Sequence, residues 1–128
     1  MIILNRIITE LLTNISLLTS LFAMLMAQAL KIIYILITEK KLNWRHFFEV
    51  GGMPSSHSAL VSCLSMMVGL LQGFDSIFFS IATILSAIVM YDAIKVRPEE
   101  VAHTLIEVST GMVFGIIVAV ISFNIFIF

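Results

Sequence analysis

Three long stretches of the chain carry almost no charge, and they set the expected architecture. Residues 11–37 contain one charged side chain, Lys31, and residues 50–91 contain one, Asp75. Residues 108–128 contain none. Roughly 20 apolar residues in a helix cross the hydrocarbon core of a bilayer. The pattern therefore predicts four transmembrane helices, at about residues 12–37, 57–73, 76–94 and 103–127.

The segments between and before these spans complete the expected fold. Residues 72–75 read QGFD, which indicates a tight turn between the second and third spans. Residues 1–10 (MIILNRIITE) are expected to form an interfacial helix or an extension of the first span. No basic head precedes the first apolar run, so a cleaved signal peptide is not expected. With no repeat or linker visible, the sequence predicts a single all-α membrane domain over residues 1–128.

Composition supports the membrane assignment and narrows the partners. The chain is 60% hydrophobic and 12% charged, and its mean hydropathy is +1.12. A soluble domain of this size would need more polar surface to cover its core. The net charge of −1 argues against a nucleic-acid partner. The single cysteine, Cys63, cannot form an internal disulfide and is expected to be a small buried hydrophobic residue.

The basic residues indicate the sidedness of the bundle. Four spans place the 38–56 and 93–102 loops on the same side of the membrane. Most of the cations lie in these loops: Lys40, Lys41, Arg45, Lys95 and Arg97. The positive-inside rule then places both loops in the cytoplasm, and we expect an integral protein of a bacterial cytoplasmic membrane. Cations that bind an anionic substrate would gather in the same place, so both causes stay open.

Polar residues at the start of the fourth span are candidates for a catalytic site. His103 and Glu107 are four residues apart, so on a helix their side chains would touch. Glu107 would accept from one imidazole nitrogen and leave the other as a nucleophile or base. The same row continues through Gly111, Gly115 and Ala119, a small-residue stripe that lets a helix of this chain or of a second copy approach closely. The alternative is a packing seam with a histidine at the interface.

Arg97 lies six residues before His103. Its guanidinium group is suited to holding a phosphate through two parallel hydrogen bonds. The alternative is an arginine that only anchors the flank of a span.

The segment Gly51–Leu60 (GGMPSSHSAL) interrupts the apolar pattern at the start of the second span. Pro54 suits the first turn of a helix, and Ser55 or Ser56 can cap it. The free N–H groups of that turn, with the helix dipole, form an anion site. His57 would then lie beside the bound anion and could donate a proton. The alternative is an ordinary capped helix after a Gly-Gly turn.

These motifs resemble a known superfamily. Pro54–His57 (PSSH) is similar to the Pro-Ser-Gly-His motif of the type 2 phosphatidic acid phosphatases, whose superfamily includes the vanadium haloperoxidases. The set of Arg97, five residues, His103, three residues and Glu107 is similar to its Arg-x5-His-x3-Asp motif. The strings GGMPSSHSA, VMYDA-x-x-VR and HT-x-x-EV look like its small, divergent membrane branch. The resemblance covers about residues 27–115.

The resemblance implies a membrane phosphatase that needs no metal or other cofactor. His103 would attack phosphorus and form a phosphohistidine, Glu107 would orient it, and His57 would protonate the leaving group. The substrate would be a lipid or isoprenoid phosphate or diphosphate, with a water-soluble phosphate ester as a second candidate. The groups expected to hold the phosphate are Lys31, Arg97, Ser55 and Ser56.

The sequence also departs from the superfamily pattern. The first motif places an arginine seven residues after its lysine, and here Thr38 stands at that distance from Lys31. Arg45 is a candidate substitute. The loop before His103 is compact compared with the divergent branch. Asp92 matches a feature of that branch and is expected to hydrogen-bond an active-site residue or to cap the third span.

Two other functions stay open at this point. The compact loop favours a non-catalytic membrane scaffold or transporter-like protein that keeps the fold without turnover. A zinc site built from His57, His103 and Glu107 is also conceivable, since two histidines and a carboxylate can bind zinc. The neighbouring arginine and lysine would oppose a cation there.

Overall fold

The helices predicted from the hydrophobic pattern are present in the structure. The computed structural model describes residues 1–39, 52–99 and 102–127, and these residues contain helices and no strand. The expected all-α membrane bundle is confirmed. In chain order its elements are α1 (Ile2–Leu12), α2 (Ile15–Glu39), α4 (Ser56–Gln72), α5 (Ile77–Tyr91), the π-helical turn η1 (Asp92–Val96) and α6 (Leu105–Ile127).

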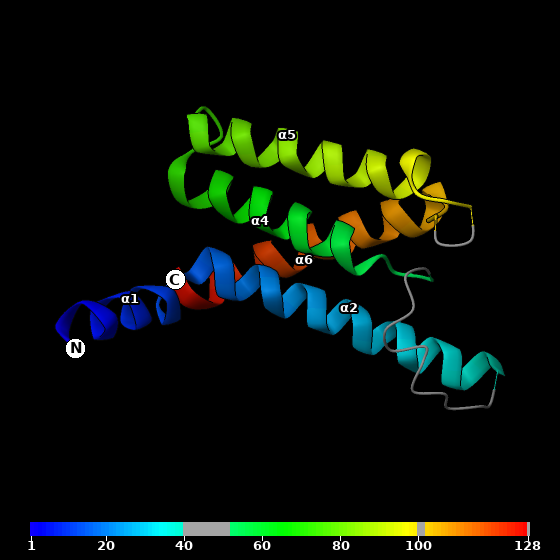
Figure 1. Ribbon diagram of the computed structural model, residues 1–128, viewed down its shortest axis with the longest axis horizontal. Coiled ribbons are helices and arrows are strands. Elements are labelled where there is room, and N and C mark those ends of the chain that lie inside the picture. The colour runs from blue at the N-terminus through cyan, green and yellow to red at the C-terminus, as the bar shows by residue number, and fades with distance from the viewer. Residues whose placement is uncertain (40–51, 100–101, 128) are drawn as a thin grey trace.

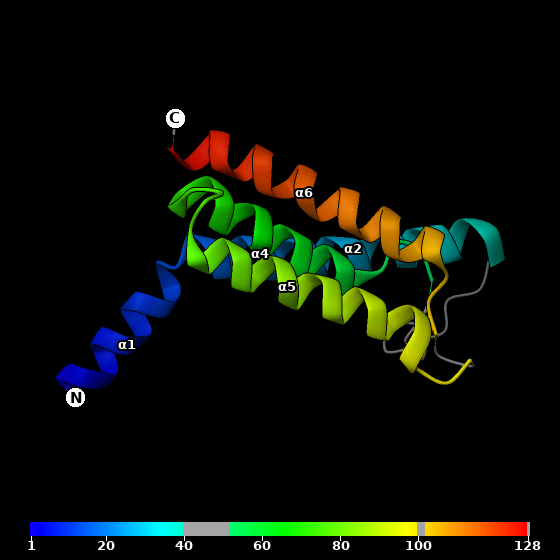
Figure 2. The ribbon, with the colours of Figure 1, turned by 90° about the horizontal axis from the view of Figure 1, so that it is seen from above.

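Three of these segments are long and apolar enough to cross a membrane: Ile15–Thr38, Ile77–Val96 and Leu105–Ile127. The fourth, α4, has 17 residues, which is the lower end of the length that spans a bilayer. It is the central helix of the bundle and packs against α2, α5 and α6. Figures 1 and 2 both show it between its neighbours. A short helix in this position is covered by protein along much of its length.

Small side chains let the helices pack closely around α4. Lipid tails are as apolar as leucine, so helices in a membrane associate through van der Waals contact and hydrogen bonds rather than through the hydrophobic effect. Ala23, Cys63, Met67 and Ala119 form a fully buried cluster. Cys63 is thus the small buried residue that was expected.

The small-residue stripe of α6 faces α4. A Cβ atom at Gly111 would collide with the backbone carbonyl of Ser55. One at Gly115 would collide with the carbonyl of Ala59 and the hydroxyl of Ser62. The prediction of a close helix approach is confirmed. Because the approaching helix belongs to the same chain, these glycines are not available to a second copy.

The N-terminal part of the chain forms a separate helix. α1 ends at Leu12, and Asn14 begins α2 by accepting a hydrogen bond from the backbone N–H of Leu17 at 3.0 Å. Every residue of α1 is exposed, and the helix points away from the bundle (Figure 2). It is therefore not a continuation of the first span.

The connectivity brings four helix ends together. The C-terminal ends of α2 and α5 lie at the same end of the bundle as the N-terminal ends of α4 and α6 (Figure 1). The opposite end carries the turn between α4 and α5, where Gly73 has a positive φ of 94° and Ser76 caps α5. The polar motifs all belong to the first end.

Candidate functional site

The motifs that are far apart in the sequence meet at this end of the bundle. Lys31 and Arg97 are both close enough to His103 to affect its ionisation, and His57 interacts electrostatically with Arg97 and with His103. Glu107 is in direct contact with His103. The structure thus brings together five of the predicted site residues, from α2, α4, α6 and the segments that precede α6. Arg45 lies outside the described residues.

A capping box at the start of α6 sets the position of Glu107. The hydroxyl of Thr104 accepts from the backbone N–H of Glu107 at 3.3 Å, and the Glu107 carboxylate accepts from the backbone N–H of Thr104 at 2.8 Å. This reciprocal pair satisfies two N–H groups that the first turn leaves free. His103 precedes the helix, which begins at Leu105. The expectation that His103 and Glu107 share a helix face was therefore wrong, although the two side chains do meet.

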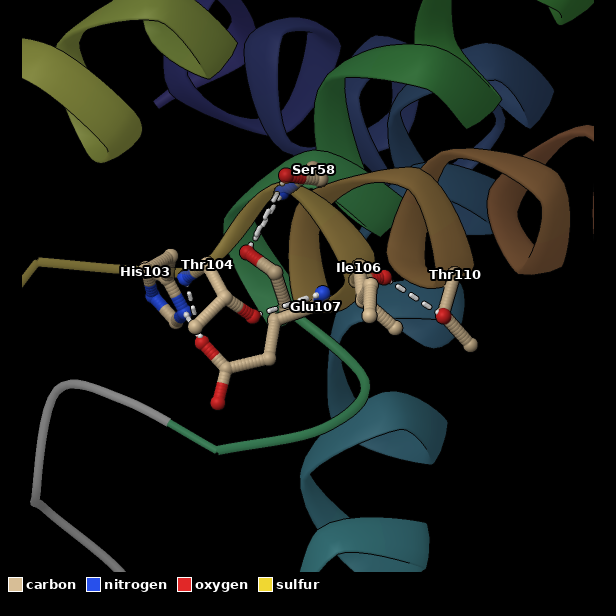
Figure 3. Close-up of polar contacts among 7 residues, drawn as sticks. Ser58, His103, Thr104, Ile106, Glu107 and Thr110 are labelled. Atoms are coloured by element: carbon tan, nitrogen blue, oxygen red, sulfur yellow. Dashed lines mark hydrogen bonds and ion pairs between the residues drawn. The ribbon is translucent and has the colours of Figure 1, made fainter.

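The imidazole of His103 is held beside this carboxylate. Its Nδ1 lies 3.3 Å from Oε2 of Glu107, and its side chain is 4% exposed. Figure 3 shows the ring next to the Glu107 and Thr104 side chains. The pair is not aligned for a hydrogen bond, and Nδ1 is the one buried side-chain polar atom without such a partner in the described part of the chain. Hydrogen bonds in catalytic sites are often loose without substrate and tighten when it binds.

His103 is fixed by its backbone as well, and its pKa is low. The N–H group of His103 donates to the carbonyl of Ala93 at 2.8 Å, which joins the start of α6 to η1. Burial lowers the pKa of His103 below its usual value, the Glu107 carboxylate partly offsets this, and Arg97 and Lys31 lower it further. The ring is therefore neutral at pH 7, which is the form that can act as a nucleophile.

The serine motif is held against α6 by its backbone. The N–H of Ser55 donates to the carbonyl of Glu107 at 3.1 Å, and the missing side chain at Gly111 makes room for this contact. The Ser55 hydroxyl accepts from the N–H of Ser58 at 3.4 Å and from its hydroxyl at 3.0 Å. Ser55 is thus the N-cap of α4, and it is one of the two serines that were expected to cap this helix. Pro54 lies before this cap and not in the first helical turn, which corrects the prediction.

His57 and Ser56 occupy the first turn of α4. Ser56 is buried and His57 is exposed. Because α4 begins at Ser56, the backbone N–H groups of both residues belong to the turn that has no partners within the helix. The exposed imidazole of His57 is close enough to Arg97 and His103 to interact with both electrostatically.

Lys31 reaches the site from inside the bundle. Its side chain is buried, with 5% exposure, and its aliphatic part lies along Gly52. Gly52 has a φ of +90°, and a Cβ atom there would come within 2.9 Å of Cε of Lys31. Glycine at this position meets both a conformational and a spatial requirement.

Asp92 pairs with Arg97, the arginine that was predicted to hold the phosphate. Nε of Arg97 donates to a carboxylate oxygen of Asp92 at 3.2 Å. The backbone N–H of Arg97 donates to the carbonyl of Asp92 at the same distance. The π-helical turn between them makes residues five positions apart neighbours. Of the two roles expected for Asp92, the structure shows a hydrogen bond, made to the candidate site residue Arg97. Asp92 is also the C-terminal cap residue of α5.

A metal site has no geometric support in the described residues. No group of three or more histidine, cysteine, aspartate or glutamate side chains is placed to hold an ion there. The zinc site considered from His57, His103 and Glu107 is not formed, and the cations Lys31 and Arg97 act electrostatically on His103.

Three structural features of the site were missed at the level of sequence. The capping box was readable, since Thr104-x-x-Glu107 has its spacing before an apolar helix. The role of Gly52 was partly readable from the Gly-Gly pair. The π-helical turn had no signal, because a separation of five residues does not correspond to a contact on an α-helix.

Comparison with known proteins identifies the chain's relatives. It is 48% identical over 88 residues to the uncharacterized membrane protein YuiD of Bacillus subtilis, a match that covers 69% of this chain and 56% of that protein. The chain therefore spans little more than half the length of this relative. No solved structure matches significantly.

A family model also matches the chain, over residues 12–101. This range includes the buried lysine, the serine motif with His57, and the pair of Asp92 and Arg97. It stops before His103 and Glu107, whose place in the site follows from the geometry described above. The matched residues cover most of the bundle, and the chain belongs to the Divergent PAP2 family.

Proposed function

We propose that this protein is a membrane-embedded phosphatase that hydrolyses a lipid or isoprenoid phosphate, or a diphosphate, through a phosphohistidine intermediate. The observation that carries the proposal is the position of His103. A buried imidazole with a low pKa stands beside a carboxylate, with Arg97 and Lys31 within electrostatic reach. Membership of the Divergent PAP2 family supports it.

The first step is attack on phosphorus. With the Nδ1 proton directed to Glu107, the Nε2 lone pair of His103 is free to form the P–N bond. The bond from phosphorus to the leaving oxygen breaks at the same time, and His57 gives that oxygen a proton. Glu107 stabilises the imidazolium as positive charge develops on it. Water then attacks the phosphohistidine, the P–N bond breaks, and phosphate is released.

The surrounding groups stabilise the charge on the transferring phosphoryl group. Phosphoryl transfer depends mainly on positioning and on electrostatic stabilisation of the equatorial oxygens. Arg97, held by Asp92, and the buried Lys31 supply fixed positive charge. Ser56 and the backbone N–H groups of the first turn of α4 supply hydrogen-bond donors. The buried hydroxyl of Ser55 is engaged with Ser58, so Ser55 contributes by capping the helix that presents these donors.

The location of the site favours a lipid substrate. It lies where α2, α4, α5 and α6 reach one end of the bundle (Figure 1), so a phosphate at the membrane surface can enter while its apolar part stays in the bilayer. The clustering of cations supports a position of this end at the cytoplasmic face. A water-soluble phosphate ester reaching the same end is the second candidate.

Replacement of the nucleophile tests the proposal. Purified protein in detergent is assayed against a panel of lipid, isoprenoid and soluble phosphates. His103→Ala should abolish turnover and any phosphoenzyme trapped by rapid acid-free quenching, while the helical content and the elution volume stay unchanged. Ser109→Ala, at an exposed position of α6, serves as the control.

Two results would contradict the proposal. Full activity of the His103→Ala variant would exclude the phosphohistidine. A wild-type protein that is well folded and hydrolyses no member of the panel would favour the non-catalytic scaffold or transporter-like alternative.

A further inference from the structure

A narrow groove runs along the bundle between α5 and α6. It has a volume of about 270 Å³, and α4 forms its floor. The residues that define its course are Ser65, Phe79, Thr83, Ala87, Met90 and Met112. Figure 2 shows α5 and α6 on opposite sides of α4.

The polar side chains of this groove are already engaged. Ser65 and Thr83 hydrogen-bond each other across the floor at 2.8 Å. Ser86 donates to the carbonyl of Val61 at 2.7 Å, and Ser62 donates to that of Ser58 at 2.6 Å. With the hydroxyl groups paired to protein atoms, the groove offers mainly carbon to an occupant. Such a surface fits a hydrocarbon and not a polar ligand.

One end of the groove adjoins the phosphate site. Met90 on α5 lies two residues before Asp92. Met112 on α6 lies five residues after Glu107, about 7.5 Å along the helix. The cationic cluster and the apolar groove are therefore neighbours, with flexible methionine side chains at their junction. Methionines adapt their shape to an irregular apolar partner.

We propose that this groove binds the hydrocarbon chain of the substrate while its phosphate lies at His103. The inference rests on the proposed function, and it specifies a phosphate monoester or diphosphate with at least one long apolar chain. The position of Met90 and Met112, which line the groove within two and five residues of Asp92 and Glu107, supports this occupant.

Filling the groove tests the inference. Ala87→Phe adds a ring inside it, and Ala29→Phe adds the same ring at an exposed position of α2. Hexadecyl phosphate and p-nitrophenyl phosphate are the long-chain and chainless substrates. Ala87→Phe should lower kcat/KM for hexadecyl phosphate roughly tenfold, about the value of one or two buried methylene groups. It should leave p-nitrophenyl phosphate hydrolysis unchanged, and Ala29→Phe should affect neither substrate.

Equal losses on both substrates, or no loss on either, would overturn the inference and leave the proposed phosphatase intact. A binding measurement covers the case of a protein without turnover. Hexadecyl phosphate carrying a photoreactive diazirine at mid-chain is cross-linked to the wild-type protein, and the adducts are mapped by mass spectrometry. We expect adducts on residues 83–90 and 112–116, and a marked reduction of them in Ala87→Phe.

The two proposals can fail separately in this experiment. Adducts in the groove without hydrolysis of any substrate would refute the phosphatase and keep the binding site. Adducts confined to another face, such as the outer surface of α2, would refute the binding site whatever the activity. A protein that elutes as a dimer and gives no lipid adduct in the groove would indicate that a second copy covers it and would also overturn the inference.

Discussion

Glu107 serves two purposes with one side chain. Its carboxylate closes the capping box with Thr104 at the start of α6, and it lies 3.3 Å from the imidazole of His103. The helix cap therefore fixes the carboxylate in the place where it can orient the nucleophile. The local rule that starts a helix and the chemistry of the site depend on the same atoms.

Replacing Glu107 by glutamine or by alanine should separate its role in capping the helix from its role in orienting His103. Glutamine also closes a capping box, so Glu107→Gln should keep the stability of the fold while turnover falls roughly a hundredfold. Glu107→Ala should lose activity and also about 1 kcal/mol of stability, the usual value of a lost cap. Thermal unfolding and kinetics together measure this. Equal stability of the two variants would contradict the structural role of the carboxylate.

The contact between His103 and Glu107 also predicts how the pH dependence of kcat/KM should change. His103 must be neutral to attack, and its pKa is lowered mainly by burial, so kcat/KM should stay high as the pH falls through 6.5, the usual histidine value. Glu107 stabilises the imidazolium and raises this pKa. In Glu107→Gln the acid limb of the pH profile of kcat/KM should therefore move to lower pH. A shift to higher pH would show that another group governs the limb.

His57 should be distinguishable from His103 by the leaving group. An alkyl oxygen needs a proton to leave, whereas nitrophenolate leaves almost unaided. His57→Ala should therefore lose roughly a hundredfold in rate on a lipid phosphate and much less on p-nitrophenyl phosphate, while His103→Ala loses both. Chelators should change neither rate. Chelator-sensitive activity without dependence on the leaving group would favour a metal mechanism.

At the scale of elements, the site depends on how closely α6 approaches α4. The absent side chain of Gly111 lets Ser55 donate its N–H to Glu107, and this bond joins the serine motif to the capping box. The π-helical turn after α5 positions Arg97 in a similar way, because it brings Asp92 into hydrogen-bond range of the Arg97 side chain. Both features position side chains through the backbone.

A methyl group at Gly111 should disturb the site more than the fold. Gly111→Ala forces a shift of rigid backbone at Ser55, which overpacks the interface by about 1–3 kcal/mol and should sharply lower activity. Gly69→Ala is the matched control, because its Cβ meets the ring of Phe74 at the far end of α4, and a side chain can move. Full activity in Gly111→Ala would show that the close approach is dispensable.

At the scale of the whole molecule, the bundle has a polar end with the site and an opposite end with the turn between α4 and α5. If the four helices span the membrane, Lys95 is on the same side as His57 and His103, and Phe74 is on the other side. The excess of basic residues at the site's end leads us to expect this end on the cytoplasmic side.

Cysteine labelling tests this arrangement. Lys95 and Phe74 are exposed, and Cys63 is fully buried, so the unmodified chain gives the background. Lys95→Cys should react with an impermeant reagent only from the cytoplasmic side, and Phe74→Cys only from the other side. Equal labelling of both positions from one side would contradict the four-span model.

The hydrophobic pattern by itself determined the helical architecture. Charges are so costly in lipid that long uncharged stretches have few alternatives to transmembrane helices, and the four main helices lie within a few residues of their expected positions. The same cost makes polar groups conspicuous in an apolar chain. Lys31, His57, Arg97, His103 and Glu107 could therefore be selected as site candidates from their sequence positions alone.

The tertiary structure decided how these residues are held and what lies beside them. His103 meets Glu107 through a capping box and not across a helix face, and Asp92 reaches Arg97 through a π-helical turn. The groove between α5 and α6 exists because both helices pack on α4 from different sides. Periodicity reports which side chains share one helix, whereas these contacts depend on where helices end and how backbones from separate segments fit together. Such contacts are set by packing in three dimensions, for which the linear pattern carries no local signal.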